Sequence, residues 1–362
     1  MPELPEVETV CRGLNQLTQG QVIRGGEVLL KSTLAYPFCV SEFDRNIQGT
    51  TIACWHRRGK YLLGQLTNAA KSAGWLGVHL RMTGQLLWVE ESFPVQKHTR
   101  IRVFMENDRE LRFVDIRTFG KVWLVPPQVA PETIITGLKK LGVEPFSSEF
   151  TTNYLQEKLK KSRRPIKTFL LDQEVIAGIG NIYADEALFK SGIRPTAIAT
   201  DLTLAQIESL RTAVVEVLQT AIDKGGTTFS DFRDVTGING NYGGVAWVYG
   251  RYGEPCRICG NAIARIKLSG RSTHYCPQCQ RGSVLRKTRE TFSVTSDQLP
   301  VTSYQGQGRQ RRILISIICL LPRHVLYLGR PQDRSGSSAR KPSAFKNPSA
   351  LCLLALGRLK FS

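Results

Sequence analysis

Four cysteines near residue 260 place the strongest constraint on how this chain can fold. Cys256 and Cys259 form one C-x2-C pair, and 16 residues separate it from a second pair, Cys276 and Cys279. This spacing is typical of two knuckles on a hairpin whose four thiolates hold one zinc ion in a tetrahedral site. Because four cysteine ligands leave no open coordination position, the predicted zinc ion is structural. The alternative is a set of buried free cysteines with coincident spacing.

The remaining composition narrows the class of protein. The other five of the nine cysteines are scattered, which favours a reduced compartment over a disulfide framework. The 49 Lys and Arg exceed the 30 Asp and Glu by 19, and such an excess favours a polyanionic partner, nucleic acid foremost. Residues 281–362 alone contain 15 basic and 3 acidic residues, so the rest of the chain carries a smaller net charge of +7.

The first third of the chain has the pattern of a β-rich domain that begins with a helix. Apolar residues at helical spacing predict a half-buried helix over residues 5–18. Eight short β-type runs separated by turn residues then predict a β-sandwich. These runs are residues 22–30, 50–56, 61–66, 75–81, 85–89, 100–105, 110–114 and 121–125.

After two prolines at 126 and 127 the pattern becomes helical. Residues 154–161, 166–172, 181–191 and 204–224 are the predicted helices. The glycine-rich stretch 237–244 is expected to be a mobile loop that covers a ligand, with a plain flexible connector as the alternative. The apolar run 313–321 is shorter than the roughly 20 residues that span a bilayer. The tail is therefore predicted to be mostly disordered, with a frameshift or read-through origin as an alternative.

The N-terminus offers a possible nucleophile. If Met1 is removed, Pro2 becomes a secondary amine with a pKa of about 8, so a useful fraction is neutral at physiological pH. Attack on the anomeric carbon of a nucleotide would give an iminium ion, which permits strand cleavage by elimination. The alternative is an ordinary helix start, in which Glu3 and Glu6 only complement the helix dipole.

Residues 1–9, MPELPEVET, closely resemble the N-terminus of bacterial formamidopyrimidine-DNA glycosylases (Fpg, also called MutM). Further matches follow in family order over residues 1 to about 281: RGKYL at 58–62, HLRMTG at 79–84, DIRTFG at 115–120 and AGIGNIYADE at 177–186. The resemblance implies a multidomain α+β fold. The expected parts are a catalytic β-sandwich (1–127), a linker (128–145), a helix-two-turn-helix domain with a lesion loop (146–246), a four-cysteine zinc finger (247–281) and an atypical basic tail (282–362).

The resemblance also assigns roles to residues at the predicted reaction centre. Pro2 would be the nucleophile, Glu3 the acid/base that protonates the deoxyribose ring oxygen, and Glu6 a supporting carboxylate. Lys60 matches a lysine that contacts phosphate and assists catalysis, although most turn lysines are simply exposed. No nucleotide cofactor is expected, because the Gly-x-Gly at 178–180 lacks a third glycine and a parallel β-α-β context.

Other matching positions are expected to contact DNA. Met82, Arg117 and Phe119 would fill the gap left by a flipped-out nucleotide, with core packing as the alternative for Met82 and Phe119. Thr118 stands where some members have a second basic residue. The remaining expected DNA contacts are His98, Lys167, Asn181 and Arg271, and the expected lesion-loop residues are Thr228, Ser230 and Tyr242.

Together these matches imply a bifunctional DNA glycosylase and AP lyase that removes 8-oxoguanine and formamidopyrimidines and cleaves by β,δ-elimination. The expected partner is damaged double-stranded DNA, and the expected cofactor is one zinc ion. The protein is expected to be a monomer and to have no membrane partner. With no leader-like segment at its start, the chain is expected in the bacterial cytoplasm, associated with the nucleoid. The alternatives are a Nei-type oxidised-pyrimidine glycosylase, against which Leu4 argues, and a non-catalytic zinc-dependent DNA-binding protein.

Overall fold

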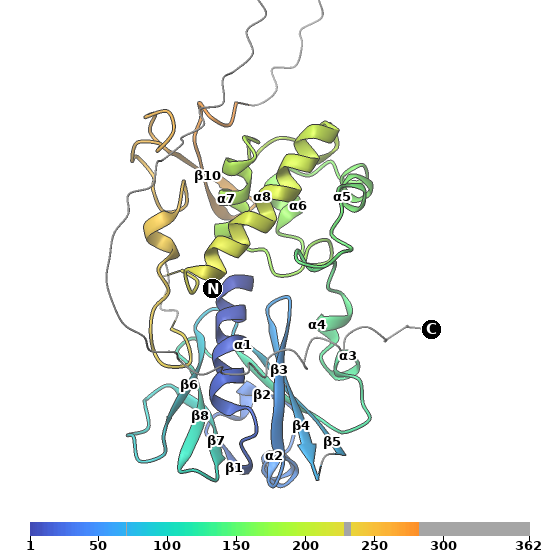
Figure 1. The fold of residues 1–362 in the computed structure, drawn as a ribbon, viewed down its shortest axis with the longest axis vertical. Helices are drawn as coiled ribbons and strands as arrows, with labels where there is room; N and C mark the ends of the chain where they lie inside the picture. The colour runs from blue at the N-terminus through green and yellow to red at the C-terminus, as the bar shows by residue number, and fades with distance from the viewer. Residues whose placement is uncertain (70, 228–232, 282–362) are drawn as a thin grey trace, which may run out of the picture. The chain divides into compact units, whose positions relative to one another are not determined.

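The computed structural model describes residues 1–69, 71–227 and 233–281 (Figure 1). The predicted disordered tail and the lesion-loop residues Thr228 and Ser230 lie outside the described residues. None of the helices in these three ranges combines the length and the apolar character needed to cross a membrane.

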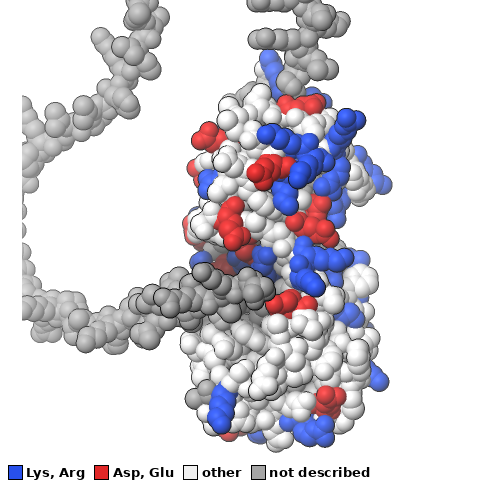
Figure 2. Space-filling model, turned by 90° about the vertical axis from the view of Figure 1, so that its right-hand side faces the viewer, with Lys and Arg blue, Asp and Glu red and all other residues white. Residues whose placement is uncertain are grey.

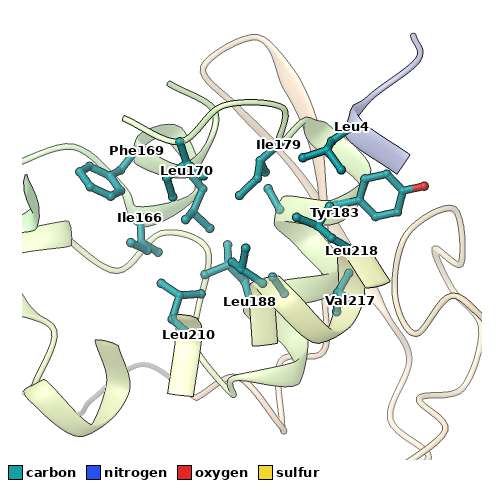
Figure 3. Close-up of a cluster of buried hydrophobic side chains, with 14 of the residues drawn as sticks. Leu4, Ile166, Phe169, Leu170, Ile179, Tyr183, Leu188, Leu210, Val217 and Leu218 are labelled. Carbon is teal, nitrogen blue, oxygen red and sulfur yellow. The ribbon is translucent and has the colours of Figure 1, made fainter. Parts of the chain in front are cut away.

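Helix α1 (Leu4–Thr18) begins where the sequence predicts it. Glu3 is its N-cap, and a capping box with Glu6 satisfies the first backbone N–H groups. Its apolar stripe, including Val7 and Leu14, is fully buried in the core of the N-terminal domain. Leu4 instead packs in the core of the helical domain, where it lies beside Ile179 (Figure 3). The first turn of α1 therefore belongs to two cores.

The N-terminal domain is a sandwich of two sheets, as predicted. One sheet has the order β1-β7-β8-β6 and the other β2-β9-β5-β4-β3. All eight predicted strands are present, whereas strand β2 and helix α2 (Val40–Ile47) were not anticipated. The strands are β1 (Ile23–Val28), β2 (Leu34–Tyr36), β3 (Thr51–Arg58), β4 (Tyr61–Asn68), β5 (Lys71–His79), β6 (Gly84–Glu90), β7 (Thr99–Met105), β8 (Arg109–Asp115) and β9 (Lys121–Val125).

The predicted linker contains two short helices, α3 (Pro131–Ile134) and α4 (Thr136–Lys139). Ile135 and Leu138 form a small apolar cluster with Tyr61, against which Trp75 and Trp123 pack. The segment is thus fastened to the N-terminal domain by burial of apolar side chains, whose removal from water is favourable.

The helical domain consists of α5 (Thr152–Leu159), α6 (Ile166–Leu170), α7 (Asn181–Lys190) and α8 (Leu204–Asp223) around one apolar core (Figure 3). Thr151 and Thr203 cap α5 and α8 with their side chains, which explains where these two helices begin. Figure 1 shows the amino end of α1 directed toward α7 and α8.

The glycine-rich stretch 237–244 is more ordered than predicted. Asn241 N donates to Lys224 O at 2.9 Å, and Tyr242 N donates to Gly226 O at 2.9 Å. Residues Tyr242–Val245 form a short 3-10 helix. These bonds fasten the second half of the stretch to the end of α8, and the expectation that the stretch covers a ligand stays a prediction.

Strands β10 (Ala264–Leu268) and β11 (Arg271–Tyr275) form the hairpin that joins the cysteine pairs. The hairpin rests on α7, where His274 N donates to Asp185 Oδ2 at 2.8 Å. Phe189 of α7 also packs in an apolar cluster with Cys256 and Cys276. The hairpin is therefore attached to the helical domain by both polar and apolar contacts.

Candidate active site

A cavity of about 340 Å³ lies where the N-terminal domain meets the helical domain. Its wall combines residues of the N-terminus, the sandwich, the linker, the helical domain and the cysteine hairpin. The lining residues are Met1, Lys60, Tyr61, His79, Arg81, Gly137, Leu141, Leu171, Gln173, Ile179, Gly180, Asn181 and Arg271.

Glu3 lies beside this cavity at the amino end of α7. Its carboxylate accepts hydrogen bonds from Ile182 N at 3.0 Å and Tyr183 N at 3.4 Å. Burial raises the pKa of Glu3 to about 7, Lys60 lowers it in part, and Glu6 raises it. A Cβ atom on Gly180 would come within 2.2 Å of Glu3 Cδ, so only glycine allows this approach. Glu3 can therefore both hold and release a proton near neutral pH.

Glu6 supports Glu3 from within the same turn. Its carboxylate accepts from Glu3 N at 2.7 Å, from Thr227 N at 2.9 Å and from the hydroxyl of Tyr183. Burial raises the pKa of Glu6, and these donors oppose the shift. Pro2 is buried next to this pair, and Met1 lines the cavity. Removal of Met1 would leave the Pro2 nitrogen at the cavity wall.

Lys60 is a buried residue and not the exposed turn lysine that was the alternative prediction. It is 7% exposed, and its Nζ donates to Ile179 O at 3.0 Å. Burial lowers the pKa of Lys60, while Glu3 and Glu6 raise it. The structure thus brings Lys60 of the N-terminal domain and Glu3 of α1 to one cavity.

A clamp that the sequence analysis missed holds the turn before Lys60. Glu144 accepts from Arg57 Nη1 at 2.7 Å, Arg58 Nη1 at 3.1 Å and Gly59 N at 2.6 Å. This carboxylate lies in the segment that connects the two domains. The two adjacent arginines before Gly59 were the available signal, but their partner Glu144, 87 and 86 residues away, was not visible in the sequence.

His79 was also missed as a member of the cavity wall. Burial lowers the pKa of His79 to about 3, so the imidazole is neutral over the physiological range. Its Nδ1 accepts from Arg81 N at 3.0 Å, which orients the ring.

The structure corrects one expected phosphate contact and leaves two others at the cavity. Lys167 is 1% exposed and its Nζ lies 2.7 Å from Asp185 Oδ1, so this ammonium is not available to a phosphate. It also donates to Ser272 O at 2.8 Å. Asn181 Nδ2 donates to the same carbonyl at 3.1 Å, and Arg271 is exposed at the hairpin. Lys167 therefore holds the hairpin that presents Arg271.

Tyr242 likewise differs from its prediction as a loop residue over the ligand. It is 2% exposed, and its hydroxyl donates to Glu186 Oε2 at 3.2 Å. Glu186 also accepts from the backbone N–H groups of Trp247, Val248 and Tyr249. Tyr242 is thus part of the domain core.

The four other expected DNA contacts lie in loops at one end of the sandwich. Phe119 is 51% exposed, so the alternative that it packs in the core is wrong. The Arg117 guanidinium lies over the Phe119 ring at 5.0 Å. Met82 and His98 are half-buried in neighbouring turns. Figure 2 shows that Lys and Arg side chains also gather on the upper part of one face, over the helical domain.

The four cysteines fit a metal site. Their sulfur atoms lie within 4.8 Å of one another, with Cys256 to Cys279 at 3.8 Å and Cys259 to Cys276 at 3.4 Å. Zinc–sulfur bonds of about 2.3 Å would separate tetrahedral ligands by about 3.8 Å. Burial raises the pKa of Cys256, but backbone N–H donors outweigh it and bring the pKa to about 7. This cluster accommodates one structural zinc ion.

Three family models match the chain in order. The formamidopyrimidine-DNA glycosylase N-terminal domain matches residues 1–122, and the H2TH domain of the same family matches residues 141–233. A zinc finger found in FPG and IleRS matches residues 253–282. Together they span the two sheets, the helical domain and the cysteine hairpin.

Similar proteins carry the same family name. The formamidopyrimidine-DNA glycosylase of Rippkaea orientalis is 67% identical over 281 residues, which are 77% of this chain and 100% of that protein. The one from Nostoc punctiforme is 64% identical, covering 80% of this chain and 100% of its own.

Solved structures agree with the sequence relatives. A Lactococcus lactis FPG mutant in complex with Fapy-dG containing DNA has a TM-score of 0.71 at 35% identity, covering 77% of this chain and 100% of that one. MutM (Fpg) from Thermus thermophilus has a TM-score of 0.69 at 38% identity, covering 78% and 99%. From its cavity, its cysteine cluster and these similarities, the chain belongs to the formamidopyrimidine-DNA glycosylase family.

Proposed function

We propose that this protein is a base-excision repair enzyme that removes oxidised purines from double-stranded DNA and then cleaves the strand at the resulting abasic site. The observation that carries this function is the state of Glu3. It is a buried carboxylate with a pKa of about 7, next to Pro2 and at a cavity that Lys60 and Arg271 line. An acid/base group with a pKa near the working pH is what proton transfer to a sugar requires.

The reaction begins after removal of Met1. The Pro2 nitrogen attacks C1′ of the damaged nucleotide, and the bond from C1′ to the base breaks as the new C–N bond forms. Glu3 protonates the sugar ring oxygen, which opens the ring and leaves an iminium ion. That ion makes the C2′ proton acidic, and the Glu3 carboxylate, which gave its own proton to the ring oxygen, accepts it as the C3′–O bond breaks and the 3′ phosphate leaves. Loss of the C4′ proton from the resulting unsaturated iminium ion then expels the 5′ phosphate. Lys60 and Arg271 supply positive charge for the phosphates that flank the site.

The remaining assignments rest on the resemblance to family motifs. Met82, Arg117 and Phe119 fill the space left in the duplex, because a thioether and an aromatic ring replace lost stacking and Arg offers hydrogen bonds to the orphaned base. Asn181 and His98 contact the backbone, and Thr228 and Ser230 cover the everted base. The enzyme acts as a monomer with one structural zinc ion and without a nucleotide cofactor, on the DNA of the bacterial nucleoid.

Borohydride trapping tests the covalent step. The full chain is incubated with a duplex that contains 8-oxoguanine, and sodium borohydride reduces the iminium ion to a stable adduct. The variant Pro2→Gly should bind the duplex as the wild type does but lose most of the trapped adduct and of the nicking. Unchanged trapping by Pro2→Gly, or full activity of protein that mass spectrometry shows to retain Met1, would reject the proposal.

The preferred damaged base distinguishes the proposed activity from the two alternative functions. Duplexes with 8-oxoguanine should be nicked faster than duplexes with thymine glycol, whereas the reverse order would indicate an oxidised-pyrimidine glycosylase. Binding without nicking of either duplex would indicate a non-catalytic zinc-dependent DNA-binding protein. A chain truncated after residue 286 should match the full chain, and loss of activity on truncation would assign the tail a role.

A further inference from the structure

A buried carboxylate, Asp115, lies where the loops that carry the proposed void-filling residues meet. It is 0% exposed. Its Oδ1 atom accepts from Thr83 Oγ1 at 2.5 Å and from Arg117 N at 3.2 Å, and its Oδ2 atom accepts from Gly120 N at 2.7 Å. Its own backbone N–H donates to His98 O at 2.9 Å. Three separate segments of the chain therefore converge on one residue.

Each of these segments carries a side chain proposed to contact DNA. Thr83 follows Met82 in the turn between β5 and β6, and Arg117 and Phe119 lie in the loop between β8 and β9. His98 directly precedes β7. Hydrogen bonds to a charged acceptor are stronger than those between neutral groups, so the Asp115 carboxylate is the strongest acceptor that could join them.

Both loops contain backbone that a free loop would avoid. Arg81 has φ 55° and Thr118 has φ 59°, and side chains other than glycine rarely adopt this left-handed region. Such conformations persist where the surrounding structure over-determines them. The bonds from Arg117 N and Gly120 N to Asp115 bracket Thr118. A Cβ atom on Gly120 would lie 2.4 Å from Phe113 Cζ, so the loop has no room to relax inward.

We infer that Asp115 is a positioning residue that presets Met82, Arg117 and Phe119 to enter the duplex together when the nucleotide leaves the stack. This inference rests on the proposed function. Because Asp115 is buried, it acts through these loops and does not touch DNA. Loops that are already ordered lose less conformational entropy on insertion, which favours the flipped state.

Two substrates separate positioning of the loops from a general effect on the enzyme. A duplex with 8-oxoguanine requires the gap to be filled, whereas a single-stranded oligonucleotide with an abasic site presents its sugar without unstacking. Full-length Asp115→Ala should excise 8-oxoguanine from the duplex about 10- to 100-fold more slowly in single-turnover reactions. Borohydride trapping on the single strand should stay within about twofold of wild type.

Two further variants control this experiment. Thr83→Val removes the hydrogen bond from Oγ1 to Asp115 and the one that Oγ1 accepts from Arg117 N at 3.0 Å, but it leaves the bonds from Arg117 N and Gly120 N to Asp115. It should give a smaller loss with the same substrate selectivity, which tests the inference even if Asp115→Ala folds poorly. Asp44→Ala controls for loss of an aspartate that accepts a backbone N–H, since Asp44 Oδ1 accepts from Gly26 N at 2.8 Å; Asp44 is exposed and lies in α2 at the other end of the domain (Figure 1). It should excise like wild type.

The outcomes distinguish the inference from the proposed function. Equal losses on both substrates, or wild-type duplex excision by Asp115→Ala, would overturn the positioning role. Wild-type protein that neither excises 8-oxoguanine nor forms the trapped adduct would instead overturn the proposed function itself.

Discussion

Two lysines are buried among the residues that the structure describes, and their surroundings differ. Lys60 lies at the cavity between the domains, and its only hydrogen bond within the described part of the chain goes to Ile179 O. Lys167 lies beneath the cysteine hairpin and contacts Asp185, Ser272 O and Thr273 Oγ1. Burial lowers the pKa of both ammonium groups.

An ammonium group has three donors, and the use of these donors separates the two lysines. The donors of Lys167 all contact groups of the protein, so this residue of α6 links α7 and β11. Lys60 uses one donor for Ile179 O within the described part of the chain, and its ammonium group lines a cavity that a ligand can enter. Two residues of the same type and similar burial therefore differ in the partners they have: those of Lys167 belong to the protein, whereas Lys60 lines the cavity of the proposed active site.

The largest effect should come from replacing Lys167, whose ammonium group contacts three groups of the protein. Lys167→Met leaves Asp185 as an unpaired buried carboxylate, so the free energy of unfolding should fall by about 3–5 kcal/mol. Urea denaturation of the full chain measures this change. The double variant with Asp185→Asn removes the stranded charge and should recover part of the loss. If Lys167→Met is as stable as wild type, the assembly role is wrong.

The next effect concerns the lysine at the cavity. Lys60→Met should slow 8-oxoguanine excision about 100- to 1000-fold, because a preorganised cation is lost from the reaction centre. Its stability should change far less than that of Lys167→Met, since within residues 1–69, 71–227 and 233–281 no carboxylate forms an ion pair with Lys60. Single-turnover kinetics and urea denaturation are compared for both variants, with Lys60→Arg as the charge-conserving control. A stability loss equal to that of Lys167→Met would erase the contrast.

A third prediction uses pH to sharpen the contrast at the cavity. The folded-state pKa of Glu3 is about 7 against an ordinary value of 4.5, so the native protein binds more protons than the unfolded chain between these values. The stability that Glu3 contributes is therefore present below about pH 4.5 and is lost as the pH rises to about 7, by at most about 3 kcal/mol. Glu3→Gln should remove this dependence. The free energy of unfolding of wild type and of Glu3→Gln is measured from pH 5 to pH 8. As the pH rises, the wild type should lose stability relative to the variant. A difference that stays constant over this range would contradict the raised pKa of Glu3.

The smallest effect concerns the hairpin that Lys167 holds. Arg271→Ala should weaken duplex binding modestly and reduce the slope of log K against log salt concentration by about 0.9, as expected for the loss of one phosphate contact. Fluorescence anisotropy over a salt series measures the slope. Arg265→Ala, on the neighbouring strand of the same hairpin, tests whether the effect is specific to Arg271. An unchanged slope for Arg271→Ala would remove this residue from the interface.

Much of this architecture was predictable from local patterns. Alternating β-type runs located all eight long strands of the sandwich, and helical spacing located the four long helices of the helical domain, because both patterns record burial of one face. Residues 31–47 offer no such alternation, so β2 and α2 were missed. The cysteine spacing sufficed to predict their clustering, since all four ligands lie on one hairpin.

The errors at the site share one cause. The resemblance predicted Lys167 as a DNA contact and Tyr242 as a lesion-loop residue, but each has a buried partner at a distance in sequence, Asp185 and Glu186. Glu144 was missed for the same reason, since its importance comes from Arg57 and Arg58 in another domain. Long-range polar pairing leaves no periodic signal in a sequence. The motif resemblance identified Glu3 and Lys60, but only the structure reveals that both are buried.

The first turn of α1 packs in the cores of both domains, and this has a mechanical consequence. Leu4 is seated in the core of the helical domain, and Leu4 N donates to Gly178 O at 3.0 Å, while Val7 and Leu14 are seated in the sandwich. The turn that carries Pro2 and Glu3 is thus anchored in both domains. A shift of one domain against the other would therefore displace these two residues as well.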